Sequence, residues 1–205
     1  MMSLAVSLAL ATSAQAETYQ TTAEVCSRTV PMTVHRPSAE PVSPDDVVIV
    51  PGERIGRADF DSFDPASLAV YGWVVEFTSP DGQRYVEMWS RELTMPPEEV
   101  YAHIGCHPDA NLSFRLDGQQ VTQAHISDGR FHLANGVRGG SPRGALTAAW
   151  PTASVTESDL YSLPLDCHEE PWTIQVDAVG SFTGVDCFDT GLMEISMYVP
   201  TTRGR

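Results

Sequence analysis

The strongest structural signal in the chain is the stretch Tyr71–Leu93, which reads YGWVVEFTSPDGQRYVEMWSREL. Two runs rich in β-branched and aromatic residues flank a short group of turn-forming residues, which is the pattern of a β-hairpin. Pro80 fixes a φ suited to a turn, Asp81 can cap the turn, and Gly82 supplies a positive φ. The sequence therefore predicts a hairpin closed by a three-residue loop with the glycine last.

The register of this hairpin places four aromatic side chains on one face. Counting outward from the loop pairs Phe77 with Tyr85 and Trp73 with Trp89. Side chains alternate between the two faces along a strand, so these four aromatic side chains lie on the same face. Both faces mix polar and apolar residues, so the pattern leaves open which one points into the core. Turned outward, the aromatic row can stack on sugar rings; turned inward, it forms the core of a β-sandwich.

Further strands are predicted on the C-terminal side of the hairpin. A meander runs from Asn111 to Ala134, and the stretches WTIQVDAV and LMEISMYV alternate apolar with polar residues. Pro and Gly, fifteen of each, punctuate the chain, and long helical periodicity is absent. The alternating positions predicted to face inward are Trp172, Ile174, Val176, Ala178, Met193, Ile195, Met197 and Val199.

These patterns give roughly nine or ten strands, enough for two packed sheets. The sequence therefore predicts an all-β fold, a two-sheet antiparallel β-sandwich or barrel, in one domain that covers residues 17–205. One short helix is predicted with Thr94 as its N-cap and Gly105 at its end, and a second one after Thr156.

Two histidines of the meander form a candidate metal site. A two-residue loop at Asp128 and Gly129 would pair His125 with His132 on the outer face. Cross-strand neighbours lie about 5 Å apart at Cβ, so both imidazoles could reach one Cu or Zn ion. No third ligand is evident, and a solvated pair of surface histidines is the alternative.

The first sixteen residues, MMSLAVSLALATSAQA, have the features of a secretory signal peptide. They carry no charge, contain an apolar run from Leu4 to Ala11, and end in the small-x-small pattern Ala14-Gln15-Ala16. The apolar run is shorter than the ~20 residues that a membrane span requires. We therefore expect residues 1–16 to be removed and the mature protein to be periplasmic or secreted.

An even number of cysteines in an exported chain predicts two disulfides. The sequence cannot choose among the three possible connectivities, and our expectation is that the first two cysteines pair with each other and the last two likewise. A split Cys/His metal site at Cys106-His107 and Cys167-His168 is the alternative, but adjacent side chains on an extended strand point to opposite faces. The expected disulfides are Cys26–Cys106 and Cys167–Cys187.

The charge of the chain excludes some classes of partner. It holds 27 acidic and 12 basic residues, the latter all Arg, for a net charge of −15. Such a charge repels phosphate backbones and anionic lipid, so neither nucleic-acid binding nor membrane insertion is expected. The loop Asn135–Gly144 is locally basic, and a carboxylate- or phosphate-bearing ligand could dock on its Arg138 and Arg143.

No sequence motif for nucleophilic or metal-dependent catalysis is present: the chain has no Gly-x-Ser-x-Gly, Ser-x-x-Lys or His-Glu-x-x-His. We therefore predict a non-catalytic binding or accessory module, without a cofactor, for a protein or polysaccharide partner. The alternative is a metal-dependent or glycoside-type hydrolase whose residues come from distant positions. The predicted ligand-binding residues are Trp73, Phe77, Tyr85, Trp89, Arg138 and Arg143.

Overall fold

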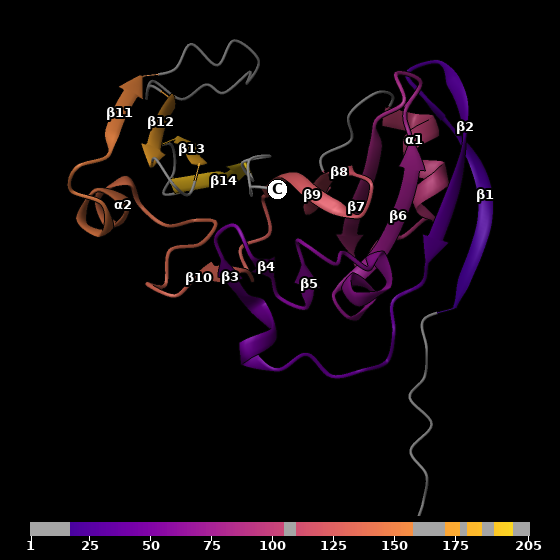
Figure 1. The fold of residues 1–205 in the computed structure, drawn as a ribbon, viewed down its shortest axis with the longest axis horizontal. Helices are drawn as coiled ribbons and strands as arrows, with labels where there is room; N and C mark the ends of the chain where they lie inside the picture. The colour runs from indigo at the N-terminus through magenta and orange to yellow at the C-terminus, as the bar shows by residue number, and fades with distance from the viewer. Residues whose placement is uncertain (1–16, 105–109, 158–170, 177–179, 186–190, 199–205) are drawn as a thin grey trace, which may run out of the picture.

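The computed structural model describes residues 17–104, 110–157, 171–176, 180–185 and 191–198 (Figure 1). Within these ranges the chain forms one ten-stranded sheet, all of whose pairings are antiparallel, and a small four-stranded sheet. The prediction of a mostly β protein with few short helices is thereby confirmed. Packing of two sheets as a sandwich or barrel is not confirmed, because the strands of the small sheet are only two or three residues long.

In spatial order, the large sheet consists of β1 (Thr18–Val25), β2 (Arg28–His35), β6 (Gly72–Thr78), β7 (Arg84–Ser90), β8 (Leu112–Asp117), β9 (Gln120–Ile126), β14 (Gly191–Tyr198), β13 (Gly180–Val185), β12 (Pro171–Val176) and β11 (Ser154–Glu157). The small sheet consists of β10 (His132–Leu133), β3 (Val48–Val50), β4 (Arg54–Ile55) and β5 (Ala58–Asp59). The helical segments are the 3-10 turns η1 (Pro44–Val47) and η2 (Pro65–Val70) and the helices α1 (Pro97–Ile104) and α2 (Arg143–Ala149).

The predicted hairpin forms as β6 and β7 with the expected register. Phe77 pairs with Tyr85 and Trp73 with Trp89. The loop is closed by a hydrogen bond from the Ser79 N–H to the Gln83 carbonyl, 2.8 Å long, and Gly82 has a φ of 85°. Local turn chemistry therefore sets this register.

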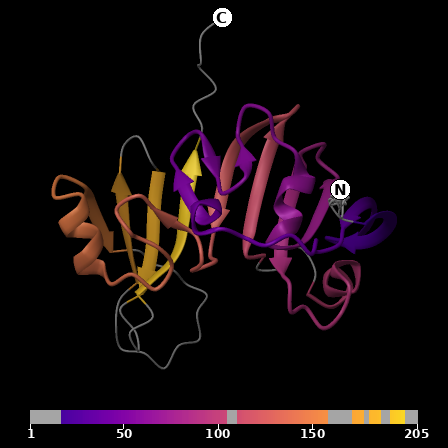
Figure 2. The same cartoon turned by 90° about the horizontal axis from the view of Figure 1, so that it is seen from below.

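Both faces of the large sheet bury apolar side chains, but against different layers. One face packs along its length on the small sheet, η2 and α2, through residues such as Phe114, Ile126 and Trp172. The other face packs on α1 near the β1 end, through Val75, Trp89 and Tyr101 among others. Figure 2 shows α2 and α1 near opposite ends of the large sheet, with the small sheet between them.

Two β-bulges decide which side chains point inward. Between β8 and β9 the register shifts after Arg115, which leaves Thr122 of β9 without a partner. Val121 and Ala124 are therefore both buried, although they are three residues apart. In β14 the shift falls opposite Met193, so Leu192 and Ile195 are both buried while Met193 is 38% exposed. The inward prediction for Met193 is therefore wrong, because strict alternation does not survive a bulge.

The helices agree with the sequence only in part. A helix forms where the first one was predicted, as α1, with Glu98 and Glu99 in its first turn. It begins at Pro97, so the prediction of Thr94 as its N-cap is wrong. The other helix, α2, covers Arg143–Ala149 and was not predicted. Most of the helix predicted after Thr156 lies outside the described residues. No helix in the described part of the chain is long and apolar enough to cross a membrane.

Candidate functional site

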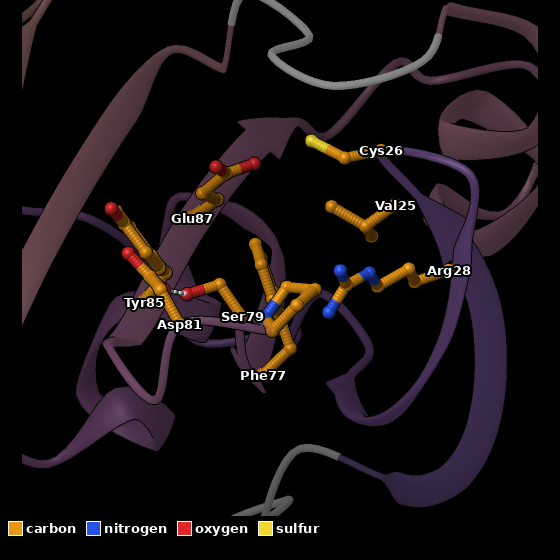
Figure 3. A pocket seen from close by; sticks show the side chains of 9 residues that line it. Val25, Cys26, Arg28, Phe77, Ser79, Asp81, Tyr85 and Glu87 are labelled. Atoms are coloured by element: carbon orange, nitrogen blue, oxygen red, sulfur yellow. Dashed lines mark hydrogen bonds between the residues drawn. The ribbon is translucent and has the colours of Figure 1, made fainter.

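A pocket with a volume of about 510 Å³ opens between the turn that joins β1 to β2 and the tip of the β6–β7 hairpin (Figure 3). It combines apolar walls with five ionisable or hydroxyl-bearing side chains, a composition typical of small-ligand sites. Its lining residues are Val25, Cys26, Arg28, Phe77, Ser79, Pro80, Asp81, Tyr85 and Glu87.

The pocket lies where two neighbouring hairpins part. Cys26 and Ser27 form a two-residue turn with φ values of 52° and 60°, the conformation of a type I′ turn. The ladder between β2 and β6 ends at Met32 and Phe77, and the next residue of β2, Pro31, has no N–H to donate. The β2–β6 ladder therefore ends before the tips of the two hairpins, and the pocket occupies the space between them.

Stacked aromatic rings form one wall of the pocket. The rings of Phe77 and Tyr85 lie 5.6 Å apart at an angle of 19°. Behind them, Tyr101 of α1 meets Phe77 edge to face at a centroid distance of 5.6 Å. Phe77 is buried and Tyr85 is half-buried, so Tyr85 offers the larger accessible aromatic surface to a ligand.

Glu87 of β7 is a buried carboxylate at this wall. Its side chain sits between Tyr85 and Trp89 on the aromatic face, and the residue is 8% exposed. The Tyr101 hydroxyl donates a hydrogen bond to its Oε2. Burial raises the pKa of Glu87 from 4.5 to about 7, and the hydrogen bond from Tyr101 acts in the opposite direction. Glu87 therefore exchanges its proton near neutral pH.

The raised pKa of Glu87 should make the folding stability depend on pH. The folded protein keeps a proton that the unfolded chain has already released, so this stabilisation is present at low pH and is lost as the pH rises through about 7. Between about pH 5 and pH 8 the free energy of unfolding of the wild type should fall by about 2 kcal/mol relative to that of Glu87→Gln, whose side chain cannot titrate. Urea denaturation of both proteins across this range measures the difference. Parallel stability curves would contradict the assignment.

Two charged side chains lie toward the other pocket walls. Arg28 is exposed at the start of β2, and its guanidinium extends into the space between the two hairpins (Figure 3). Asp81 accepts hydrogen bonds from the Ser79 hydroxyl and the Gln83 N–H, and these bonds hold the pKa of its carboxyl below the usual value. Asp81 is therefore engaged in stabilising the turn, whereas Arg28 extends into the pocket.

Only part of the predicted aromatic row lines the pocket. Trp89 is buried beside Tyr101, with ring centroids 5.9 Å apart. Trp73 is half-buried, and the guanidinium of Arg36 lies 5.8 Å from its ring centroid. The row is thus mainly packed against α1, and the structure brings Phe77 and Tyr85 to the pocket but neither tryptophan.

The predicted basic site does not join this pocket. Arg138 is exposed in the loop after β10, and Arg143 is half-buried at the first residue of α2. The loop after β10 is hydrogen-bonded to Leu192 of β14, and α2 lies near the β11 end of the large sheet, whereas the pocket lies at the β1 end (Figure 1). Neither arginine lines the pocket.

The predicted pairing of His125 with His132 does not form. His125 pairs with Ser113 and Ser196 in the large sheet, whereas His132 pairs in parallel with Val48 in the small one. The prediction failed because the chain leaves the large sheet after Ile126 instead of turning back along β9. Among the residues that the structure describes, no three His, Cys, Asp or Glu side chains are grouped as metal ligands would be.

His125 takes part in a local polar network instead. Its Nδ1 lies 2.8 Å from Glu194 Oε1 and 3.0 Å from Ser196 Oγ, and its Nε2 lies 2.6 Å from Gln123 Nε2. The contact with His125 lowers the pKa of Glu194. Because the Ser196 hydroxyl donates to Glu194, this network does not present an activated nucleophile.

Three of the four cysteines, Cys106, Cys167 and Cys187, lie outside the described residues, and so does the proposed signal peptide. Cys26 is not a free thiol, and it borders the pocket. The pairing of the four cysteines therefore stays a prediction.

Sequence reasoning did not identify Glu87 and Arg28 as site residues. A signal for Glu87 was present, because it is a single carboxylate between two aromatic residues on the same face of a strand. Arg28 had no comparable signal, since it reaches the pocket only through the packing of two hairpins that are distant in sequence.

Comparisons with known proteins add no further information about this site. The chain matches no protein-family model, and no curated protein or solved structure is significantly similar to it. The function is therefore inferred from the geometry and chemistry of the pocket.

Proposed function

We propose that the protein is an exported binding module that holds the end of a carbohydrate chain in the pocket between the β1–β2 and β6–β7 hairpins. The observation that carries this proposal is the stacked pair Phe77 and Tyr85, which forms a wall of a concave site beside Glu87 and Arg28. Aromatic rings bind the apolar faces of sugars, and charged side chains accept from or donate to their hydroxyl groups.

The size of the pocket favours a small ligand over a folded protein partner. Its volume of about 510 Å³ falls in the range of small-molecule sites, about 300–1,000 Å³. A stable protein partner would require a surface of about 800 Å² on each side. The polysaccharide member of the two predicted partner classes is therefore the better fit.

Binding rather than hydrolysis is proposed because the pocket offers one carboxylate suited to proton transfer. Glycoside hydrolysis uses two carboxyl groups that flank the scissile bond. Glu87 could donate a proton, but Asp81 is occupied by its hydrogen bonds within the turn.

The proposed Cys26–Cys106 disulfide would hold the β1–β2 side of the pocket in place.

Replacement of Tyr85 tests the proposal, because its ring supplies the accessible aromatic surface. In isothermal titration calorimetry with a panel of soluble oligosaccharides, Tyr85→Ala should bind about tenfold more weakly, or worse, than the wild type. Tyr85→Phe keeps the ring and should bind nearly as well.

Trp73→Ala serves as the control, because Trp73 is half-buried outside the pocket. If no oligosaccharide bound, or if Tyr85→Ala bound as tightly as the wild type, the proposal would be wrong. Shortened products in the titration cell would instead favour the hydrolase alternative.

A further inference from the structure

Glu87 has one carboxylate oxygen that is hydrogen-bonded and one that is not. Tyr101 donates to Oε2, and Oε1 has neither a hydrogen bond nor an ion pair among the described residues. Glu87 is nevertheless 8% exposed and lines the pocket. An acceptor without a partner, on a buried residue that lines a pocket, is available to a donor from a ligand.

The missing donor is best supplied by a cation. Burying a carboxylate without a partner is costly, and an ion pair with additional hydrogen bonds compensates for part of that cost. No cation in the described part of the chain neutralises Glu87, and burial raises its pKa to about 7. The contact with Glu87 would therefore contribute more binding free energy for a positively charged ligand than for a neutral one.

The surroundings of Glu87 suit an ammonium group. Tyr85 and Phe77 lie beside it and Tyr101 packs behind them, and aromatic rings attract organic cations through their π faces. The net charge of −15 also draws cations toward the protein.

The other charged groups around the pocket make Glu87 the position for the cation, and they indicate where the rest of the ligand would lie. Arg28, from β2, borders the pocket and would repel a positive charge placed next to it, but its five N–H groups can donate to hydroxyl or ring oxygens. Asp81 is engaged in the turn, and Cys26 is not a free thiol. The pocket is therefore polarised, with one acidic and one basic side.

We infer that the carbohydrate is an amino sugar whose ammonium group binds Oε1 of Glu87, while its hydroxyl groups face Arg28. This inference rests on the proposed function, because it names the ligand class of the same pocket. Binding deprotonates any Glu87 that is protonated in the free protein, and the proton passes to the solvent. Proton release on binding is thus an obligatory signature, greatest below the pKa of free Glu87.

The test compares two matched ligands, a glucosamine tetramer and an N-acetylglucosamine tetramer, by isothermal titration calorimetry at about pH 6. Titrations in two buffers of different ionisation enthalpy count the protons released. The free-amine tetramer should bind about tenfold more tightly than the acetylated one and should release a proton, whereas the acetylated tetramer should release none.

Glu87→Gln provides the second arm, because it keeps the shape of the protonated side chain. This variant should lose both the preference for the free amine and the proton release, and it should still bind the acetylated tetramer. Equal affinities of the two tetramers for the wild type, or a preference that survives in Glu87→Gln, would overturn the inference while the proposed function stands. If neither tetramer bound, the inference would be wrong, and the oligosaccharide panel would decide on the proposed function.

Discussion

Phe114→Ala is expected to lower the free energy of unfolding by about 3–5 kcal/mol. Phe114 lies in β8 and is fully buried. Its ring contacts that of Phe63 at a centroid distance of 4.9 Å and that of Phe60 at 6.4 Å. Because Phe60 and Phe63 follow β5, this cluster joins the large sheet to the layer that covers it.

Guanidinium denaturation followed by circular dichroism measures the loss. Thr78→Ala, at an exposed position of β6, is the control and should change stability by less than about 0.5 kcal/mol. A loss below about 1 kcal/mol for Phe114→Ala would mean that the covering layer is not packed on β8 as described.

Gly56→Ala is expected to destabilise the protein by about 2–5 kcal/mol, through two effects that add. Gly56 has a φ of 57°, a left-handed conformation that costs an alanine about 1–2 kcal/mol. A methyl group there would also overlap the carbonyl oxygen of Asp46 and the hydroxyl of Tyr71. Those two groups are hydrogen-bonded to each other, so neither can move aside without breaking that bond.

Gly52→Ala is a matched control for the second effect. Gly52 has a similar φ of 73°, but a methyl group there would meet no atom within 4 Å. It should therefore show only the conformational cost, about 1–2 kcal/mol. Thermal denaturation of the two variants separates the cost of the left-handed backbone from the cost of the steric overlap. Equal losses of stability in the two variants would contradict the packing described around Tyr71.

The sequence predicted the elements whose determinants are local. The register of β6 and β7 follows from Pro80, Asp81 and Gly82, and α1 carries the predicted Glu98 and Glu99 in its first turn. Inward positions such as Trp172 and Ile174 follow from simple alternation. Turn chemistry and side-chain periodicity act over a few residues, so one sequence contains enough information to predict them.

Features that depend on distant segments were missed or mispredicted. Met193 points outward because of a bulge opposite β13, and His132 pairs with a strand more than eighty residues earlier in the chain. The pocket itself joins the β1–β2 turn to the β6–β7 hairpin. Phe77 and Tyr85 were proposed from the sequence as ligand contacts, and Glu87 lies on the same face of the same hairpin. Only the packing of two hairpins places Arg28 beside them.

The strand order of the large sheet also has a consequence for the entropy of folding. The sheet is composed of three runs in which spatial neighbours are consecutive strands: β1–β2, β6 to β9, and β11 to β14. Within each run of this kind, most pairings require the ordering of only a modest length of intervening chain. The β2–β6 and β9–β14 junctions instead enclose long segments, including the whole small sheet. The entropic cost of bringing remote parts of the chain together is therefore concentrated at two lines of hydrogen bonds that join three otherwise sequential units.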